Sequence, residues 1–328
     1  SEDGFELYTP EEIGAFDAGT AGTIWRDELL REAAIRDTQL SVSGGNENLT
    51  YFFSLGNFKQ EGVIKGSGFE RYSAKISLNG DLKDKLRFGT DLTFSQSDYE
   101  GDFGDSSSNS YAGGYIDAYS PPPTFPVRDE DGNYIVENPF SAFPFPNPVE
   151  NALEITRDQR NLNFLGNVFV EYDITESLKI KQLFGVNYTS RNVRQYEPTF
   201  TQRSNFIGRA RQVHALNTNL LSTTTLNFDK KLGQHKINGV LGYEVQDREN
   251  QSFNGDARDF ANDDTGYYSL GSGTELFSLG SNYSNQGLQS FLGRFNYIFD
   301  GRYYVTVTGR YDGSSKFQGD NQYSFFPS

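Results

Sequence analysis

The sequence has no cysteine, no methionine and no long apolar run. Without cysteine, disulfides and thiolate metal sites are excluded. A mean hydropathy of -0.62, and the lack of any apolar run of about 18 residues, exclude a transmembrane helix. They do not exclude a membrane β-barrel, because strict alternation hides a lipid-facing side from any average over the sequence.

Positive charge is also scarce. The formal net charge of -15 argues against nucleic acid as a partner, because phosphates require a basic surface. The 28 Phe, 20 Tyr and 34 Gly favour strands and turns over helices. A natural reading frame begins with methionine, so the chain is a processed product or an internal piece of a longer protein. We expect an internal piece, because the last residues, NQYSFFPS, lie within a pattern that we expect to continue.

Residues 71–95, RYSAKISLNGDLKDKLRFGTDLTFS, show the dominant pattern. Successive side chains of a strand point to opposite faces, so this stretch predicts a hairpin with one apolar and one polar face. The apolar side carries Tyr72, Ile76, Leu86, Phe88 and Leu92. We expect this side to contact membrane lipid, whereas the polar side faces water.

The same alternation recurs along the chain and predicts an all-β fold, an antiparallel transmembrane β-barrel segment of about ten strands. Most strands run ten residues or more, and about 9–11 residues are needed to cross a membrane. Short turns alternate with long loops, as in outer-membrane barrels. We predict a loop and a short helix (24–36) within residues 1–37, and a partial barrel over 38–328 with long loops at 97–160, 191–212 and 248–286.

If the polar side encloses a wet lumen, charged side chains there are tolerated because water reaches them. The residues predicted to line this lumen are Arg71, Lys75, Arg87, Asp91, Lys179, Lys181, Arg294 and Arg310.

Three stretches resemble the SusC/RagA-type TonB-dependent transporters of Bacteroidetes. The first, residues 24–79, has the Trp25 and Asp27 pair, a strand ending in Ser-Gly-Gly at 43–45, and then Gln60 and Gly62. The second is the Pro-rich PPPTFPVRDEDGNYIVENPFS (121–141). The third is RYYVTVTGRYDGSSKFQGDNQYSFFPS (302–328). Together, in this order, they span almost the whole chain.

The resemblance implies a barrel of about 22 strands, a size typical of plugged transporters. It also implies an N-terminal plug, a segment that contacts TonB, and a surface lipoprotein of the SusD type, in the cell outer membrane. The expected cargo is an oligosaccharide, or less often a peptide. The chain departs from the family pattern because the plug, the TonB-contacting segment and the later strands are missing from it.

Other functions remain open at this point. A barrel of this kind could carry an iron chelate or cobalamin, or the protein could be a non-transporting adhesin or outer-membrane hydrolase; a large soluble β-protein is a further alternative. Neither His214 nor His235 has a serine or an acid at a spacing that suggests a catalytic triad. We therefore expect no enzyme activity.

Two acidic groups and one aromatic loop are the remaining candidate sites. Asp129, Asp131 and Asn133 match the start of a calcium loop, but the pattern then fails, and Asp131-Gly132 instead predicts a turn. We expect no cofactor, although Asp256, Asp259, Asp263 and Asp264 leave loop calcium open. The candidate substrate contacts are the loop aromatics Tyr111, Tyr115, Tyr119, Phe125, Phe143 and Phe145.

Overall fold

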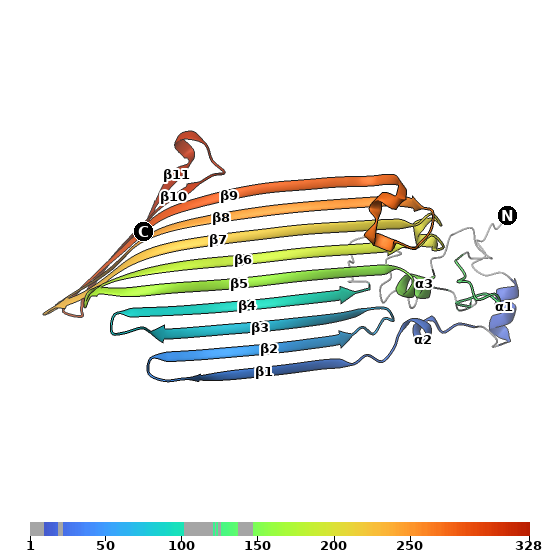
Figure 1. Cartoon of the computed structure of the whole chain (residues 1–328), viewed down its shortest axis with the longest axis horizontal. Helices are drawn as coiled ribbons and strands as arrows, with labels where there is room; N and C mark the ends of the chain where they lie inside the picture. The colour runs from blue at the N-terminus through green and yellow to red at the C-terminus, as the bar shows by residue number, and fades with distance from the viewer. Residues whose placement is uncertain (1–9, 19–21, 102–120, 122, 124–125, 137–146) are drawn as a thin grey trace, which may run out of the picture.

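The computed structural model describes residues 10–18, 22–101, 121, 123, 126–136 and 147–328. Its strands form a single antiparallel sheet in sequence order, from β1 to β11 (Figure 1). The strands are β1 (Ile35–Gly45), β2 (Leu49–Glu61), β3 (Gly68–Asp81), β4 (Leu86–Glu100), β5 (Thr156–Thr175), β6 (Leu178–Glu197), β7 (Arg209–Leu232), β8 (His235–Phe260), β9 (Gly273–Phe299), β10 (Tyr303–Ser314) and β11 (Tyr323–Pro327).

The helices are short and lie in the connections or ahead of the sheet. They are α1 (Pro10–Asp17), α2 (Trp25–Leu29) and α3 (Pro148–Leu153), with the 3-10 turns η2 (Gln202–Ser204), η3 (Gly266–Tyr268), η4 (Leu270–Ser272) and η5 (Gly319–Asn321). The three α-helices lie at the right-hand end of the sheet in Figure 1. Among the described residues, no helix is long and apolar enough to cross a membrane.

The connections differ between the two ends of the sheet, as the sequence predicted. At one end β3 and β4 are joined by residues 82–85, and β7 and β8 by residues 233–234. At the other end the connections are longer, and one of them, 101–155, contains α3. We call these the turn end and the loop end of the sheet.

The hydrogen-bond register assigns every strand residue to one of two faces. Lys75 pairs with Thr93, and Tyr72 pairs with Gln96 on the opposite face. The apolar face carries large exposed side chains, such as Phe184, which is 58% exposed, and Leu241, which is 65% exposed. No second sheet covers them in the part of the chain that the structure describes. A contiguous exposed apolar surface of this size marks a lipid- or protein-contacting surface.

The apolar face forms a band of limited height. On β4 it runs from Leu86 to Phe94, and on β9 from Phe291 to Phe299. These spans match the about 9–11 residues that cross a bilayer. β8 and β9 are 26 and 27 residues long, so these strands extend well beyond the band toward the loop end.

The strands are staggered, as closure of a barrel requires. Following the register from Leu86, the first residue of β4, across the sheet leads to Gly293 of β9, but β9 continues to Phe299. This offset is roughly 20 Å over five strand spacings of roughly 24 Å in total. It corresponds to a tilt of about 40°, within the range of closed barrels. The predicted fold class is therefore confirmed as an antiparallel barrel segment, with eleven strands among the described residues instead of about ten.

Two boundary predictions were wrong. The predicted helix at 24–36 ends at Leu29, because Leu30 bridges Ile64 and the Arg31 amide donates to the Val63 carbonyl; a helix this short gains little from propensity. The predicted loops at 191–212 and 248–286 are shortened, since β6 reaches Glu197 and β8 reaches Phe260. Helix α2 does pack as expected, with Trp25 buried against Val149 of α3.

Candidate functional site

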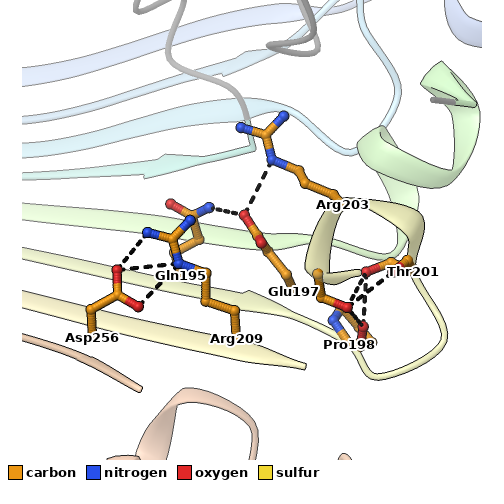
Figure 2. Close-up of polar contacts among 8 residues, drawn as sticks. Gln195, Glu197, Pro198, Thr201, Arg203, Arg209 and Asp256 are labelled. Atoms are coloured by element: carbon orange, nitrogen blue, oxygen red, sulfur yellow. Dashed lines mark hydrogen bonds and ion pairs between the residues drawn. The ribbon is translucent and has the colours of Figure 1, made fainter. Parts of the chain in front are cut away.

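A cluster of hydrogen-bonded polar side chains lies where β6, β7 and β8 meet the loop end, on the polar face. We call it the rim cluster, and Figure 2 shows its contacts. Its members are Gln195, Glu197, Thr201, Arg203, Arg209 and Asp256. They come from the ends of three adjacent strands and from the β6–β7 loop, so rigid strand backbone positions most of them.

Glu197 is the buried carboxylate of this cluster. Alternation places Gln195 on the same face, and its Nε2 donates to Glu197 Oε1 at 2.7 Å. Arg203 Nε donates to the same oxygen at 3.1 Å. The Glu197 side chain is 1% exposed, and its Oε2 has no hydrogen-bond partner among the described residues. A buried charge is tolerated only when it is paired, so Arg203 holds the β6–β7 loop against β6.

Arg209 and Asp256 form the second ion pair. Arg209 Nε donates to Asp256 Oδ1 at 3.0 Å, and Nη2 donates to Oδ2 at 2.5 Å. The Asp256 side chain is 5% exposed, and that of Arg209 is 30% exposed. This two-point geometry is the strong form of an Arg–carboxylate contact, and it joins β7 to β8 at the rim (Figure 2).

The β6–β7 loop is shaped by local hydrogen bonds. The hydroxyls of Thr201 and Ser204 donate to the Pro198 carbonyl at 2.8 and 2.7 Å (Figure 2). Two consecutive residues, Asn205 and Phe206, then adopt left-handed backbone at φ of 54° and 61°. This conformation is uncommon outside glycine, and asparagine is one of the residues that tolerate it. Arg203 lies in η2, just before this turn, and its side chain reaches back to Glu197.

More arginines than acids gather at this rim. The Arg258 guanidinium lies 3.5 Å from the centre of the Phe277 ring, and its Nε has no hydrogen-bond partner among the described residues. Arg211, one alternation step from Arg209, is exposed. The guanidinium groups of these residues are suited to bind carboxylate, sulfate or phosphate groups in a two-point geometry.

Helix α3 contacts the β6–β7 loop through Glu150. Asn147 caps the helix, because its Oδ1 accepts from the amides of Val149 and Glu150 at 3.0 and 3.3 Å. Its Nδ2 donates to the carbonyls of Val127 and Ile135 at 2.8 and 3.1 Å. Burial raises the pKa of Glu150 to about 7, although the Gln202 amide donates to its carboxylate and opposes that rise. A titrating carboxyl therefore lies between α3 and the β6–β7 loop.

Helix α3 should become less stably docked as the pH rises from about 5 to above 7. The folded-state pKa of Glu150 is about 7 against an ordinary value of 4.5. Below 4.5 the carboxyl is protonated in both states; as the pH rises, the unfolded state ionises first and docking weakens by up to about 3 kcal/mol. Hydrogen exchange of residues 147–154 in the full-length protein measures this.

The matched variant for that measurement is Glu150→Gln, which removes the titration and keeps the side-chain shape. Protection of residues 147–154 in this variant should vary with pH only as intrinsic exchange does, and at pH 8 it should exceed that of the native chain. The same pH dependence in both proteins would exclude Glu150 as its source.

The eight residues that were predicted to line a lumen all fall on the polar face by register. Arg87 pairs with Glu171 and with Asp173, each at 2.6 Å. Arg310 pairs with Asp312 at 2.7 Å and with Glu244 at 3.3 Å. The six candidate aromatic contacts, Tyr111, Tyr115, Tyr119, Phe125, Phe143 and Phe145, lie outside the described residues.

The first acidic group lies in a turn, and the second is divided between the end of β8 and the connection that follows it. At the Asp131-Gly132 turn, Arg128 bridges Tyr134 and Gly132 has a φ of 88°, which confirms the turn. In the second group, Asp256 is held by Arg209, whereas Asp263 accepts from the Tyr196 hydroxyl at 2.7 Å. Within the described ranges, no group of three or more acidic or histidine side chains is arranged to hold a metal ion.

A groove of about 790 Å³ opens on the other side of the sheet. It lies beyond the apolar band toward the loop end, where the apolar face becomes polar at Glu70 and Asp98. Tyr267 of η3 closes one side and donates its hydroxyl to Asp158 Oδ2 at 2.9 Å. The groove thus belongs to the outer surface of the sheet and not to the rim cluster.

Comparisons with known proteins agree with this geometry. No family profile matches the chain. TonB-dependent receptor P26 of Formosa agariphila is 32% identical over 93% of this chain and 30% of its own length. TonB-dependent receptor SusC of Bacteroides thetaiotaomicron is 29% identical over 95% of this chain and 32% of its own length. In fold, the structure of the RagAB peptide transporter matches with a TM-score of 0.78 and 22% identity, over 93% of this chain and 35% of that one.

A tilted sheet with one lipid-height apolar band and one charged face defines part of an outer-membrane β-barrel. The chain belongs to the TonB-dependent receptors of the SusC type. It spans about a third of the length of the curated relatives that it matches. These relatives are all named as receptors.

Proposed function

We propose that the protein containing this chain imports a nutrient across the outer membrane, with energy supplied through TonB. The main support is that one face of the sheet carries an apolar band as tall as the hydrocarbon layer of a bilayer, whereas the opposite face is rich in charge. The chain is also similar to SusC along 95% of its length. This arrangement allows lipid outside and water inside. The polar face, including Arg71 and Lys181, then lines the lumen.

The favoured cargo is an oligosaccharide, with a peptide as the second candidate. Similarity to SusC supports the first, and the fold match to the RagAB peptide transporter supports the second. A SusD-type surface lipoprotein is the proposed partner, and we expect it to meet the loop end of the sheet, whose described connections include the β6–β7 loop. No covalent chemistry is required, because capture and release are conformational steps.

Deletion of the gene should abolish growth on one oligosaccharide or on peptides as sole carbon source and leave growth on glucose unchanged. The expected cause is loss of uptake, which labelled-substrate accumulation in whole cells measures directly. Complementation with the intact gene is the control. A defect seen only under iron or cobalamin limitation would assign the receptor to those cargoes, and unchanged uptake of every substrate would favour an adhesin.

A further inference from the structure

We propose that the lumen selects negatively charged cargo, namely an oligosaccharide that bears carboxylate or sulfate groups. The inference rests on the proposed import function and adds the chemical class of the substrate. It follows from the distribution of charge between the two faces of the sheet and from the pairing of those charges on the polar face.

Most acids of the polar face already have a basic partner. Seven of them take part in ion pairs: Glu171, Asp173, Glu197, Asp229, Glu244, Asp256 and Asp312. Their partners on the same face or in the adjoining loop include Arg87, Arg209 and Arg310. These groups are neutral except the one at Arg310, which faces both Glu244 and Asp312 and so leaves one negative charge.

The polar face also carries more basic residues than these ion pairs use. Those with no ion pair among the described residues are Arg71, Lys75, Lys181, Arg191, Arg211, Lys231, Arg248, Arg258 and Arg294. The acids of the polar face that likewise have no ion pair among the described residues are Asp37, Asp81, Asp91 and Glu275. The face therefore carries an excess of unpaired positive charge, although the whole chain has a net charge of -15.

The opposite face shows the reverse bias beyond its apolar band. Acids predominate there, namely Glu61, Glu70, Asp98, Glu100, Asp158, Asp247 and Glu249. The basic residues near them are fewer, namely Arg36, Lys59, Arg160 and Arg194, and Arg160 is paired with Asp98 at 2.6 Å. Positive charge is thus concentrated on the polar face and is not a general property of the surface.

Several of these unpaired basic side chains contact an aromatic ring and no carboxylate. Lys181 Nζ is 4.0 Å from the centre of the Phe169 ring, and Lys75 Nζ is 5.9 Å from that of Phe52. Cation–π contacts hold these side chains and leave their charge uncancelled. A flat ring beside a cation suits a sugar ring with an acidic substituent, because apolar ring faces and charged oxygens are contacted together.

Three of the unpaired arginines stand toward the loop end, where cargo would arrive. Arg211 is the register partner of Asp256, on the adjacent strand. Arg258 stacks on Phe277. Arg248 lies on β8, further from the loop end. A water-filled cleft with low-dielectric walls focuses the field of such charges and raises the local concentration of anions. Guanidinium groups also bind carboxylate and sulfate oxygens in a two-point geometry.

The test compares one glycan with and without charge on the same backbone. Full-length protein in detergent is titrated with short dextran sulfate oligosaccharides and with unsulfated dextran oligosaccharides of equal length. The sulfated probe should bind at least tenfold more tightly, and its affinity should fall as salt is raised. In the triple variant Arg211→Gln, Arg248→Gln, Arg258→Gln this preference should drop at least tenfold.

The control is a triple variant that removes the same number of positive charges from the apolar face, namely Arg36→Gln, Lys59→Gln, Lys230→Gln. It should keep the preference for the sulfated probe. Equal binding of both probes, or an equal loss in the control variant, would overturn the inference. So would a rim variant that keeps its preference but melts at lower temperature, because the arginines would then pair with acids elsewhere in the protein. Uptake loss on gene deletion tests import separately, so either proposal can fail alone.

Discussion

Val168→Arg should prevent the full-length protein from assembling in the outer membrane. Val168 lies near the middle of the apolar band on β5 and is 46% exposed. If that exposed surface contacts hydrocarbon, an arginine there costs about 2–4 kcal/mol at the bilayer midplane. The measurement is the amount of folded protein in the outer-membrane fraction, judged by resistance to unfolding in detergent without heating.

Leu165→Arg is the matched control, on the same strand and the opposite face. Leu165 is 50% exposed, close to the 46% of Val168. Both substitutions replace an apolar side chain with arginine. Its register neighbour is Asn187 of β6, on the polar face, where water accommodates the charge. Equal loss of assembly in both variants, or in neither, would contradict the assignment of lipid to one face.

The alternation that predicted the sheet also explains where prediction stopped. Inside the apolar band one face must be apolar and the other polar, so residues such as Phe88 and Arg87 alternate clearly. Beyond the band both faces meet water, and the two-residue period disappears: Arg194 and Gln195 are polar neighbours on opposite faces. The ends of β6 and β8 were consequently predicted as loops.

The rim cluster was missed for the same reason and for a second one. Glu197 and Arg209 lie in the segment that was predicted as a loop, where no pattern marked them. Arg209 and Asp256 are 47 residues apart in sequence, and only the β7–β8 register brings them together. By contrast, the faces of Arg71 and Lys181 could be predicted, because each lies within a strand that alternates clearly.

The pairing of Arg209 with Asp256 leads to the second large effect. Arg209→Met should destabilise the loop end strongly, because it leaves a carboxylate with a 5% exposed side chain and without its cation. Breaking a buried pair by removing one partner costs about 3–5 kcal/mol. Hydrogen exchange of residues 198–208 and of the adjoining ends of β7 and β8, in the full-length protein, should accelerate about a hundredfold or more.

The double variant Arg209→Met, Asp256→Leu separates loss of the pair from the burial of an unpaired charge. Replacing both partners by apolar side chains of similar volume is often neutral, so most of the lost protection should return. Arg211→Met, an exposed neighbour on β7, should leave exchange near the native rate. If the single and double variants exchanged equally fast, the Asp256 carboxylate would not be the group that requires Arg209, and the rim would be held by the Arg203–Glu197 contact alone.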